Sequence, residues 1–493
     1  MEKLLIYVVT FNHEKFIKKT IERIDQKIFK NFDTEILVND DSSTDNTLEI
    51  LKKFKSELSG KVKFNILSNP KNLGYGGNQK IGYHYAIKNN FDYVALLHGD
   101  GQYAPEILSD LLSSFKIKNV KAVFGTRMLK RFDAIKGGMP LYKFFGNKIL
   151  TYLQNKILKS KMSEFHSGYR IYKVNALNEI PFHLNSNDYT FDTEIIIQFL
   201  ISNFKIKEIP IPTFYGEEIS YVNGFYYAYR IINESLKAKI QTLGIFYDKK
   251  YDLIKDENNY KFKKNFTSTH SLTFQMIKEN SYVLDLGCND GEMIRFLENK
   301  KNCRTVGIDV NTSKPKKIEG EYHPCNLDGD LPNIKFDDFD FIVFLDVIEH
   351  LKSPENFMSK LYAKLINNEK VQIIISTPNI SFIIMRIMLL FGFFNYGKRG
   401  ILDKSHTRLF TFSSFKKLIE NSNFSIVETR GVPAPYPLAV GENFIGKFLI
   451  SLNNFFIRLW KSMFAYQIIC RIKPNKSLDM LLSKAKIKYK QVN

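Results

Sequence analysis

The stretch from Tyr93 to Glu106 carries polar side chains directly after a run of apolar ones. The run Val94 to Leu97 has the length and composition of a buried strand, and Pro105 is placed to start a helix. Between them lie Asp100 and Gln102, whose side chains can turn to the same side. Ligands of open α/β sheets bind outside the carboxyl ends of strands, and carboxylate oxygens suit a divalent cation. The stretch therefore predicts a metal site for a nucleotide diphosphate, with an ordinary strand-to-helix turn as the alternative.

Two further polar clusters follow the first two predicted strands. Thr10 and Glu14 come after the first strand, and Asp40 comes after the second. Oxygen atoms at such an edge can bind ribose hydroxyls or a base N–H. The neighbouring segment Asp41 to Asp45 is also typical of a helix N-cap. A glycine-rich turn at Gly74 opens the next helix and predicts a close approach of backbone to phosphate.

Asp192 and Glu194 begin an apolar helix after a polar loop. A carboxylate at that place could deprotonate an acceptor hydroxyl. It could equally cap the helix.

A second set of polar groups lies in the carboxyl-terminal half. Asp285, Gly287 and Asn289 lie where a predicted strand turns through glycine into a helix, and Asp309 ends another strand about 20 residues on. An acidic residue at that distance suits the two hydroxyls of a ribose. The third glycine of a dinucleotide site is absent.

Asp346, Glu349 and His350 follow a later strand at spacings that would put them on one helical face. A histidine such as His350 is a residue type suited to taking a hydroxyl proton. It could instead be a metal ligand or a structural histidine at a helix start. His406 either faces an acceptor or packs in the interior.

The elements that must position these groups alternate between strand and helix. Alternation of this kind predicts an α/β fold with mostly parallel, doubly wound sheets. The segment from Phe246 to Phe266 is rich in Lys, Asp and Asn, lacks an apolar period and is predicted to be a linker. The expected organisation is a domain over residues 1–230, a helix and linker over 231–270, a second domain over 271–431 and a tail over 432–493.

The composition is that of a globular protein with anionic partners. The chain has 493 residues and a formal net charge of +20, which points to phosphates, anionic lipid, acidic glycan or nucleic acid. Its four cysteines form no C-x-x-C pair, which favours a reducing compartment. No stretch reaches the ~20 apolar residues of a membrane span, and the amino terminus resembles a first strand more than a signal peptide. We therefore expect a cytoplasmic protein.

Two apolar segments bear on membrane contact. Phe382 to Phe394 is too short for a span and is predicted to be an acceptor-site cover or an interfacial helix. From Asn443 to Arg471, apolar residues recur at spacings of three and four with basic residues between them, which predicts a basic amphipathic helix. This helical tail either packs on the body or contacts the inner face of a membrane.

Six motifs in order, VVTFNHE, VNDDSSTDNT, NLGYGGNQ, HGDGQYAPE, FGTR and SGYRIY, resemble the family-two glycosyltransferases of the GT-A type. The similarity is greatest to the dolichyl-phosphate-mannose-synthase-like branch and covers roughly residues 1–230. It implies that Thr10, Glu14 and Asp40 hold the nucleoside. It implies that Asp100 and Gln102 bind Mg²⁺ or Mn²⁺.

The same resemblance implies that Arg127 and Arg170 face the diphosphate or the acceptor. A cation and arginine side chains would offset the charge that grows on a leaving nucleoside diphosphate. His98 stands where the family motif commonly has an aspartate, so one metal ligand is missing or is replaced by imidazole.

The letters VLDLGCNDG, GIDVN and FDFIVFLDVIEHLKSPE resemble the class I S-adenosylmethionine-dependent methyltransferases, which are Rossmann-like. The match spans about residues 271–431 and is closest to the small-molecule O-methyltransferases. It implies the following cofactor contacts: Asp285, Gly287 and Asn289 near the methionine part, Asp309 on the ribose, Asn326 and Leu327 beside the adenine, and Asp346 at the cofactor edge. The D/N-P-P-Y/F signature of amino-directed methylation is absent, which favours O-methylation.

These features predict a bifunctional enzyme. One domain would transfer a sugar from a nucleotide-diphosphate sugar to a glycan or polyprenyl-phosphate acceptor, and the other would O-methylate a glycan with S-adenosylmethionine. One alternative makes the second domain a cofactor-binding or docking module without catalysis. Another is a nucleic-acid-binding methyltransferase that uses the positive charge, although the aromatic-basic pattern of a nucleic-acid module is not evident and no nucleic-acid partner is expected.

Overall fold

The computed structural model describes residues 1–58, 62–130, 133–212, 223–242, 247–253, 265–315, 318, 320–366, 368, 370–477 and 480–482. The chain divides into two compact units. Unit 1 contains the described residues up to Thr242 together with residues 247–253, and unit 2 contains the described residues from 265 onward.

Unit 1 is built on a seven-stranded mixed sheet in the order β3-β2-β1-β4-β6-β5-β7. Strands β1 to β4 are parallel to one another, β6 is antiparallel to both of its neighbours, and β7 is parallel to β5. The strands are β1 (Lys3–Thr10), β2 (Asp33–Asp40), β3 (Lys63–Ser68), β4 (Tyr93–His98), β5 (Val120–Thr126), β6 (Arg170–Lys173) and β7 (Lys205–Pro210). The strands expected at Val94 to Leu97 and directly before Thr10 and Asp40 are thus confirmed as β4, β1 and β2.

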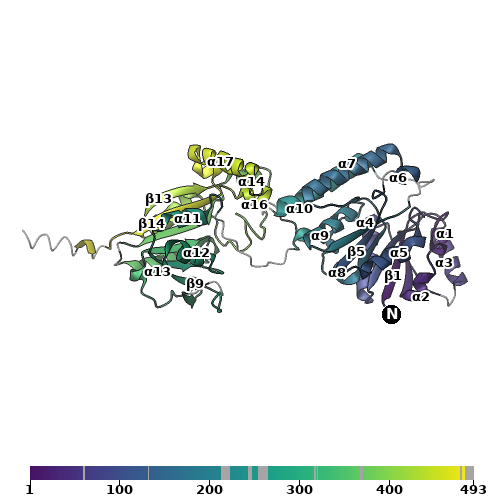
Figure 1. Ribbon diagram of the computed structural model, residues 1–493, viewed down its shortest axis with the longest axis horizontal. Helices are drawn as coiled ribbons and strands as arrows, with labels where there is room; N and C mark the ends of the chain where they lie inside the picture. Colours follow the sequence, from purple (N-terminus) through teal and green to yellow (C-terminus); the bar gives the residue numbers. More distant parts are fainter. Residues whose placement is uncertain are drawn as a thin grey trace, which may run out of the picture. The chain divides into compact units, whose positions relative to one another are not determined.

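Helices cover both faces of this sheet (Figure 1) because successive residues of each strand point to opposite sides. Leu4, Ile6 and Val8 of β1 pack toward one group of helices, and Leu5 and Tyr7 pack toward the other. The first group is α1 (Ile17–Glu22), α3 (Thr47–Glu57) and α5 (Leu108–Ser113); the second is α4 (Tyr75–Lys88), α8 (Val174–Asn178) and α9 (Phe191–Ile201). The sheet is therefore buried on both sides, and its strand ends remain for ligands.

Unit 1 extends past residue 230, where the sequence predicted it to end. The helix α10 (Gly224–Thr242) and the 3₁₀ turn η4 (Lys249–Tyr251) both belong to it. Tyr251 is buried against α9 and α10. The predicted linker over 246–266 is wrong at Lys250 and Tyr251, because Lys250 pairs with the buried Glu194 and Tyr251 lies in a hydrophobic cluster. Residues 246 and 254–264 lie outside the described part.

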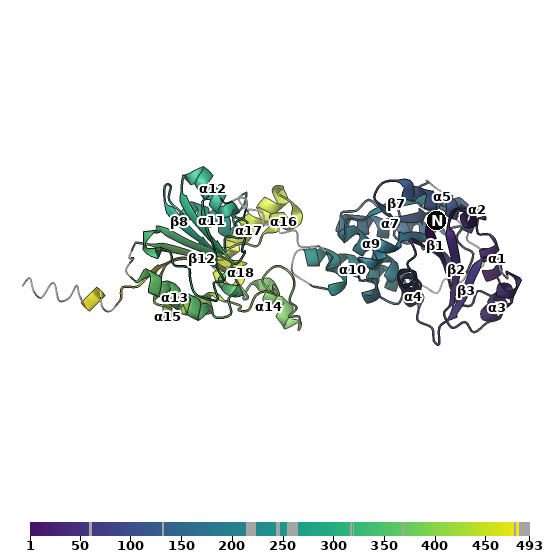
Figure 2. The same cartoon turned by 90° about the horizontal axis from the view of Figure 1, so that it is seen from below.

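Unit 2 is built on a second seven-stranded sheet, in the order β10-β9-β8-β11-β12-β14-β13. The first five are parallel, whereas β14 runs antiparallel to both β12 and β13. The strands are β8 (Tyr282–Leu286), β9 (Arg304–Asp309), β10 (Glu321–Pro324), β11 (Phe341–Leu345), β12 (Gln372–Pro378), β13 (Phe424–Val432) and β14 (Gln467–Pro474). Figure 2 shows α11 (Thr269–Met276) and α12 (Glu292–Lys301) on one face, and α13 (Pro354–Leu365) and α15 (Phe412–Asn421) on the other.

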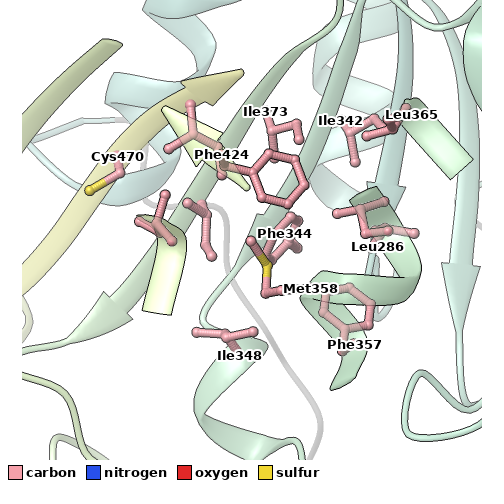
Figure 3. Close-up of a cluster of buried hydrophobic side chains, with 14 of the residues drawn as sticks. Leu286, Ile342, Phe344, Ile348, Phe357, Met358, Leu365, Ile373, Phe424 and Cys470 are labelled. Atoms are coloured by element: carbon pink, nitrogen blue, oxygen red, sulfur yellow. The ribbon is translucent and has the colours of Figure 1, made fainter. Parts of the chain in front are cut away.

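The larger core of unit 2 lies under α13 and α15. Phe344 and Ile373 of neighbouring parallel strands meet Phe357 and Met358 of α13 there (Figure 3), and Cys470 of β14 joins them. All four cysteines are free thiols.

The predicted boundary at residue 431 and the wholly helical tail are wrong. Within 432–493, β14 pairs with β12 from Gln467 to Ile472, so this segment is an interior strand of the sheet and not an appendage. Helix α17 ends at Leu459, well before the expected Arg471, and residues 478–479 and 483–493 lie outside the described part.

Helix α17 (Phe444–Leu459) turns its predicted apolar stripe outward. Ile445, Phe448, Leu452, Phe455 and Leu459 are 40–68% exposed, whereas the buried residues of this helix are Gly446, Ile450 and Asn453. These side chains therefore do not pack into unit 2, and contact of the stripe with a membrane surface stays a prediction. No helix in the described part of the chain combines the length and apolar character that crossing a bilayer would require.

Candidate active sites

The carboxyl ends of β1, β2 and β4 meet at one edge of the unit 1 sheet. In the strand register Thr10 is paired with Asp40, and Val9 is paired with His98. Asp100 follows two residues after His98 on the same edge. The sequence predicted this convergence, and the structure brings these groups together; we call this edge the unit 1 site.

Side-chain hydrogen bonds join the loops after β1 and β2 into one wall of the unit 1 site. The Asn12 side chain accepts the Thr44 N–H at 2.8 Å, and Glu14 accepts the Asn46 N–H at 3.0 Å. Asp40 accepts hydrogen bonds from the N–H and the hydroxyl of Ser43. These contacts fix both loops before any ligand arrives, and they use part of the acceptor capacity of Glu14 and Asp40.

Asp100 keeps a carboxylate oxygen for a ligand. Its Oδ1 accepts the Gln102 N–H at 3.0 Å, and its Oδ2 accepts no hydrogen bond from the described residues. The side-chain amide of Gln102 likewise has no protein partner among them. Two half-buried oxygen donors at a sheet edge fit a hard divalent cation, which prefers oxygen ligands.

His98 is held as a neutral imidazole beside this pair. Its Nε2 lies 3.1 Å from the Tyr75 hydroxyl, its ring meets Tyr103 edge-on, and burial lowers its pKa. A Cβ at Gly168 would lie 2.6 Å from the ring, so glycine is needed there. Because Nε2 already contacts the Tyr75 hydroxyl, this atom is not free to bind a metal ion in place of the family's aspartate.

His13 belongs to the unit 1 site, although the sequence analysis gave it no role. Its Nδ1 lies 3.2 Å from Thr10 Oγ1. Burial lowers the pKa of His13, opposed by the charges of Asp100, Asp45 and Asp40. Its place directly after the first strand was the signal that could have identified it.

Two arginines expected to face a substrate are instead bound to protein groups. Arg127 pairs with the buried Glu164, and its Nη2 donates to the carbonyl of His166 at 3.1 Å. Arg170 is only 1% exposed and donates to the carbonyls of Ser167, Asp192 and Phe165. The guanidinium of Arg170 is thus occupied inside the domain, which does not support ligand contact, and that contact stays a prediction.

Asp192 lies on the inner side of the unit 1 site. Its carboxylate accepts the Tyr75 hydroxyl at 3.1 Å and the Gln79 amide at 3.2 Å, and it lies 3.3 Å from Arg170 Nη1. Tyr75 thus connects Asp192 to His98. Asp192 is 6% exposed, and Tyr75 links its carboxylate to His98.

Glu194 has a structural environment. It is fully buried, accepts the Ser186 N–H, and pairs with Lys250 Nζ at 2.7 Å. The same ammonium group lies 2.7 Å from Glu234 of α10. These partners enclose the carboxylate, so its burial gives no support to the catalytic role predicted for Glu194, which stays a prediction.

The glycine turn before α4 packs against protein and not toward an open edge. The Gly74 N–H donates to Asp41 Oδ2 at 3.0 Å, and a Cβ at Gly74 would lie 2.6 Å from the Asn187 carbonyl oxygen. That carbonyl accepts the N–H groups of Gly76 and Gly77. The expected phosphate contact of this turn is not supported, because its amides are already used.

The glycine turn of unit 2 does adjoin its acidic partner. Gly287, at φ +78°, donates its N–H to the Ile308 carbonyl at 2.7 Å, and Asn289 donates its N–H to Asp309 Oδ2 at 2.8 Å. Burial and the Asp309 charge raise the pKa of Asp285 to about 7. The predicted cofactor residues at the ends of β8 and β9 therefore form one cradle, which we call the unit 2 site.

Residues after β10 and β11 complete its surroundings. The N–H of Cys325 donates to the Asp309 carbonyl, which brings the exposed Asn326 and the buried Leu327 to the edge beside Asp309. Asp346 accepts the Ser376 hydroxyl at 2.8 Å and the Gln467 amide at 2.6 Å. Gln467 opens β14 and was not identified from sequence.

Glu349 and His350 lie in a 3₁₀ turn, η6 (Ile348–His350), and Asp346 has a left-handed backbone at φ +54°. The expectation that the three residues share an α-helical face is therefore wrong. The turn still brings Glu349 and His350 together with His406.

Comparison with known proteins separates the two halves of the chain. Residues 5–181 match the family model described as glycosyl transferase family 2, and residues 259–429 match a methyltransferase domain model. The chain is 27% identical over 243 residues to an uncharacterized protein of Methanocaldococcus jannaschii, a match that covers 48% of this chain and 93% of that protein.

A second relative is the UDP-N-acetylglucosamine–dolichyl-phosphate N-acetylglucosaminyltransferase of Methanococcus voltae. It is 27% identical over 228 residues, which is 44% of this chain and 88% of that protein. Glucosyl-3-phosphoglycerate synthase from Mycobacterium tuberculosis, solved with uridine diphosphate, is 14% identical with a TM-score of 0.36 and covers 48% of this chain and 80% of that chain. The chain carries a family 2 glycosyltransferase domain followed by a methyltransferase domain.

Proposed function

We propose that unit 1 transfers a sugar from a nucleotide-diphosphate sugar to a polyprenyl-phosphate or glycan acceptor, and that unit 2 O-methylates a glycan with S-adenosylmethionine. The observation that carries the first activity is the free Oδ2 of Asp100 at the edge where Thr10, Asp40 and His98 meet. The relative from Methanococcus voltae, named for transfer to dolichyl phosphate, supports the acceptor class.

Asp100 and Gln102 would hold Mg²⁺ or Mn²⁺. When bound, such an ion offsets the negative charge that develops on a departing nucleoside diphosphate. Thr10, Glu14 and Asp40 brace the wall against which the nucleoside lies, and His13 lies in the same wall.

Asp192 is the group in this unit that we assign to accept a proton from an acceptor hydroxyl. It is bound to Tyr75, which also contacts His98 at the metal edge. A phosphate acceptor would already be ionised and would need no base, so the requirement for Asp192 depends on the acceptor.

In unit 2 we assign Asp285, Gly287 and Asn289 to the methionine part of S-adenosylmethionine and Asp309 to its ribose. Asn326, Leu327 and Asp346 border the same cradle. The sulfonium of the bound cofactor supplies the methyl group. The chain's own residues orient the acceptor, and His350 lies four residues after Asp346.

We propose that the exposed stripe of α17 contacts an anionic membrane surface near a lipid-linked acceptor. The basic residues Lys447, Arg458 and Lys461 flank the exposed apolar side chains. Apolar insertion combined with attraction to anionic lipid is the mode of binding that such a helix favours.

The test of sugar transfer is Asp100→Asn in the full chain. We expect turnover to fall by at least about 100-fold, the scale of losing one electrostatic stabiliser of transition-state charge. Mass spectrometry of products from uridine- and guanosine-diphosphate sugars with polyprenyl phosphate provides the measurement. Asp110→Asn, at an exposed aspartate of α5, is the matched control; undiminished turnover in Asp100→Asn contradicts the assignment.

A further inference from the structure

Glu349 of the η6 turn is a buried carboxyl group. It is 1% exposed, and among the described residues no group lies within hydrogen-bonding geometry of either carboxylate oxygen. Burying a carboxyl group in this way is costly unless it is paired or coordinates a metal. Both oxygens are therefore available to a ligand.

Two histidines present nitrogen atoms to the same place. Nδ1 of His350 lies 3.2 Å from the Ser405 carbonyl oxygen, and Nδ1 of His406 lies 2.9 Å from the Ile401 carbonyl oxygen. A carbonyl oxygen only accepts, so each Nδ1 carries the proton and each Nε2 keeps a lone pair. An N–H donated to a backbone carbonyl is the usual support of a metal-bound histidine.

The three side chains converge although 56 residues separate His406 from His350. One ligand atom from each of Glu349, His350 and His406 lies within 4.8 Å of the others, and the two imidazole rings have centroids 4.8 Å apart. The Glu349 carbonyl accepts the N–H groups of Thr407 and Arg408 at 2.8 and 3.1 Å. These backbone bonds hold His406 against the η6 turn.

The cluster adjoins the predicted cofactor cradle. Val347 lies between Asp346 and the cluster, and its Cγ2 is 2.5 Å from the position that a Cβ would occupy at Gly287. Asp346 itself is bound to Ser376 and Gln467. The cluster therefore lies in the loop that packs against the glycine turn at Gly287.

We propose that Glu349, His350 and His406 bind a divalent transition-metal ion that positions the acceptor hydroxyl for methylation. Two imidazoles and one carboxylate suit Zn²⁺ or another borderline ion better than Mg²⁺. Three protein ligands leave coordination positions open, as in catalytic sites. This inference rests on the proposed methyltransferase function of unit 2.

Methylation at this site forms a C–O bond and breaks a C–S bond. The acceptor O–H, acidified by the cation, gives its proton to solvent. An oxygen lone pair then forms a bond to the methyl carbon while the C–S bond breaks and its electron pair stays on sulfur. The products are a methyl ether and a neutral thioether.

Metal binding can be measured without any acceptor. The full chain carrying Asp100→Asn, which removes the other predicted cation site, is stripped with a chelator and titrated with Zn²⁺, Mn²⁺ or Co²⁺. We expect one ion per chain, with Co²⁺ giving visible absorption typical of nitrogen ligands. Adding His406→Ala should weaken binding by more than about 100-fold, beyond the effect of outer-shell changes.

Two further variants keep this test decisive. Glu349→Gln preserves the shape of the side chain and should also lose the ion, which covers the case in which His406→Ala fails to fold. His323→Ala, at a histidine that pairs with Glu321 elsewhere in unit 2, should bind the ion as before. Absence of binding, or binding that survives Glu349→Gln, overturns the site.

The outcome for the metal and the outcome for the proposed function are distinguishable. Bound metal with no methyl transfer to any glycan leaves the site in place and counts against the function. Methyl transfer that persists in chelator counts against the role of the ion while supporting the function.

Discussion

At the scale of single residues, the buried carboxyl of Asp285 is the group whose protonation most directly affects the unit 2 site. Its pKa is raised to about 7, first by burial and then by the charge of Asp309. Below pH 7 the folded protein therefore holds Asp285 largely in its neutral form. A ligand that carries an ammonium group would favour the ionised form.

We expect S-adenosylmethionine to bind about five times more tightly at pH 7 than at pH 6. Only about a tenth of Asp285 is ionised at pH 6, and about half at pH 7, while the ligand's α-amino group, with an ordinary pKa near 8, stays mostly protonated. Isothermal titration at the two pH values measures the change. In Asp285→Asn binding should be weak at both, and an unchanged pH dependence in that variant would assign the effect to another group.

Residues whose role depends on a strand end were predictable from sequence, and residues whose role depends on remote packing were not. Asp40 and Asp100 follow apolar runs, so parallel strands bring them to one edge. Arg170 also follows a polar loop, yet its guanidinium is bound by Phe165, Ser167 and Asp192. Nothing local to its motif indicates those carbonyl partners.

At the scale of elements, β14 is the strand that completes the unit 2 sheet. Ile468, Cys470 and Ile472 enter one core and Ile469 enters the other. The sequence predicted that the helix now seen as α17 continues through β14. Apolar residues are dense in both segments, so their spacing did not mark where the helix ends. The partners of β14 lie 35 to 99 residues earlier, and this antiparallel pairing has no signal in the segment itself.

Ile472→Ala should lower the free energy of unfolding of unit 2 by about 2–5 kcal/mol, through lost burial and a cavity. Urea unfolding followed by tryptophan fluorescence reports this unit, since Trp460 is the chain's single tryptophan and lies in it. Lys473→Ala, at the exposed neighbour on the same strand, should change stability by less than about 0.5 kcal/mol. Equal effects of the two variants would remove β14 from the core.

Helix α17 should bind anionic vesicles through its exposed apolar side chains. Phe448→Ser with Phe455→Ser should weaken binding to vesicles rich in anionic lipid by at least about tenfold, since each phenyl group contributes more than 1.4 kcal/mol when buried, roughly 1.5–3 kcal/mol. Vesicle sedimentation measures binding. Both side chains are 55% exposed, so stability should not change. Val427→Ser, at an exposed apolar residue of β13, is the control, and equal loss there would contradict a specific role for α17.

At the scale of the whole molecule, each unit has its own cores, its own sheet and its own edge at which strand ends gather polar groups. The core packing of unit 1 contains β1 to β7, and that of unit 2 contains β8 to β14. Neither sheet borrows a strand from the other unit. The reaction proposed for the sheet edge of one unit therefore needs no residue of the other unit.

Two single substitutions in the full chain should consequently separate the activities. Asp309→Ala removes the acceptor for the Asn289 N–H and the proposed ribose contact, so S-adenosylmethionine binding should weaken by at least about tenfold, the loss of roughly 1.4 kcal/mol, while sugar transfer continues. Asp100→Asn should do the reverse. Titration of the cofactor and mass spectrometry of glycan products, scored for an added sugar and an added methyl group, measure both.

A chain in which Asp100→Asn also abolishes methylation of a supplied glycan would indicate that the second unit acts only on the product of the first while it is still bound. A wild-type chain that binds the cofactor yet never methylates would make unit 2 a docking module.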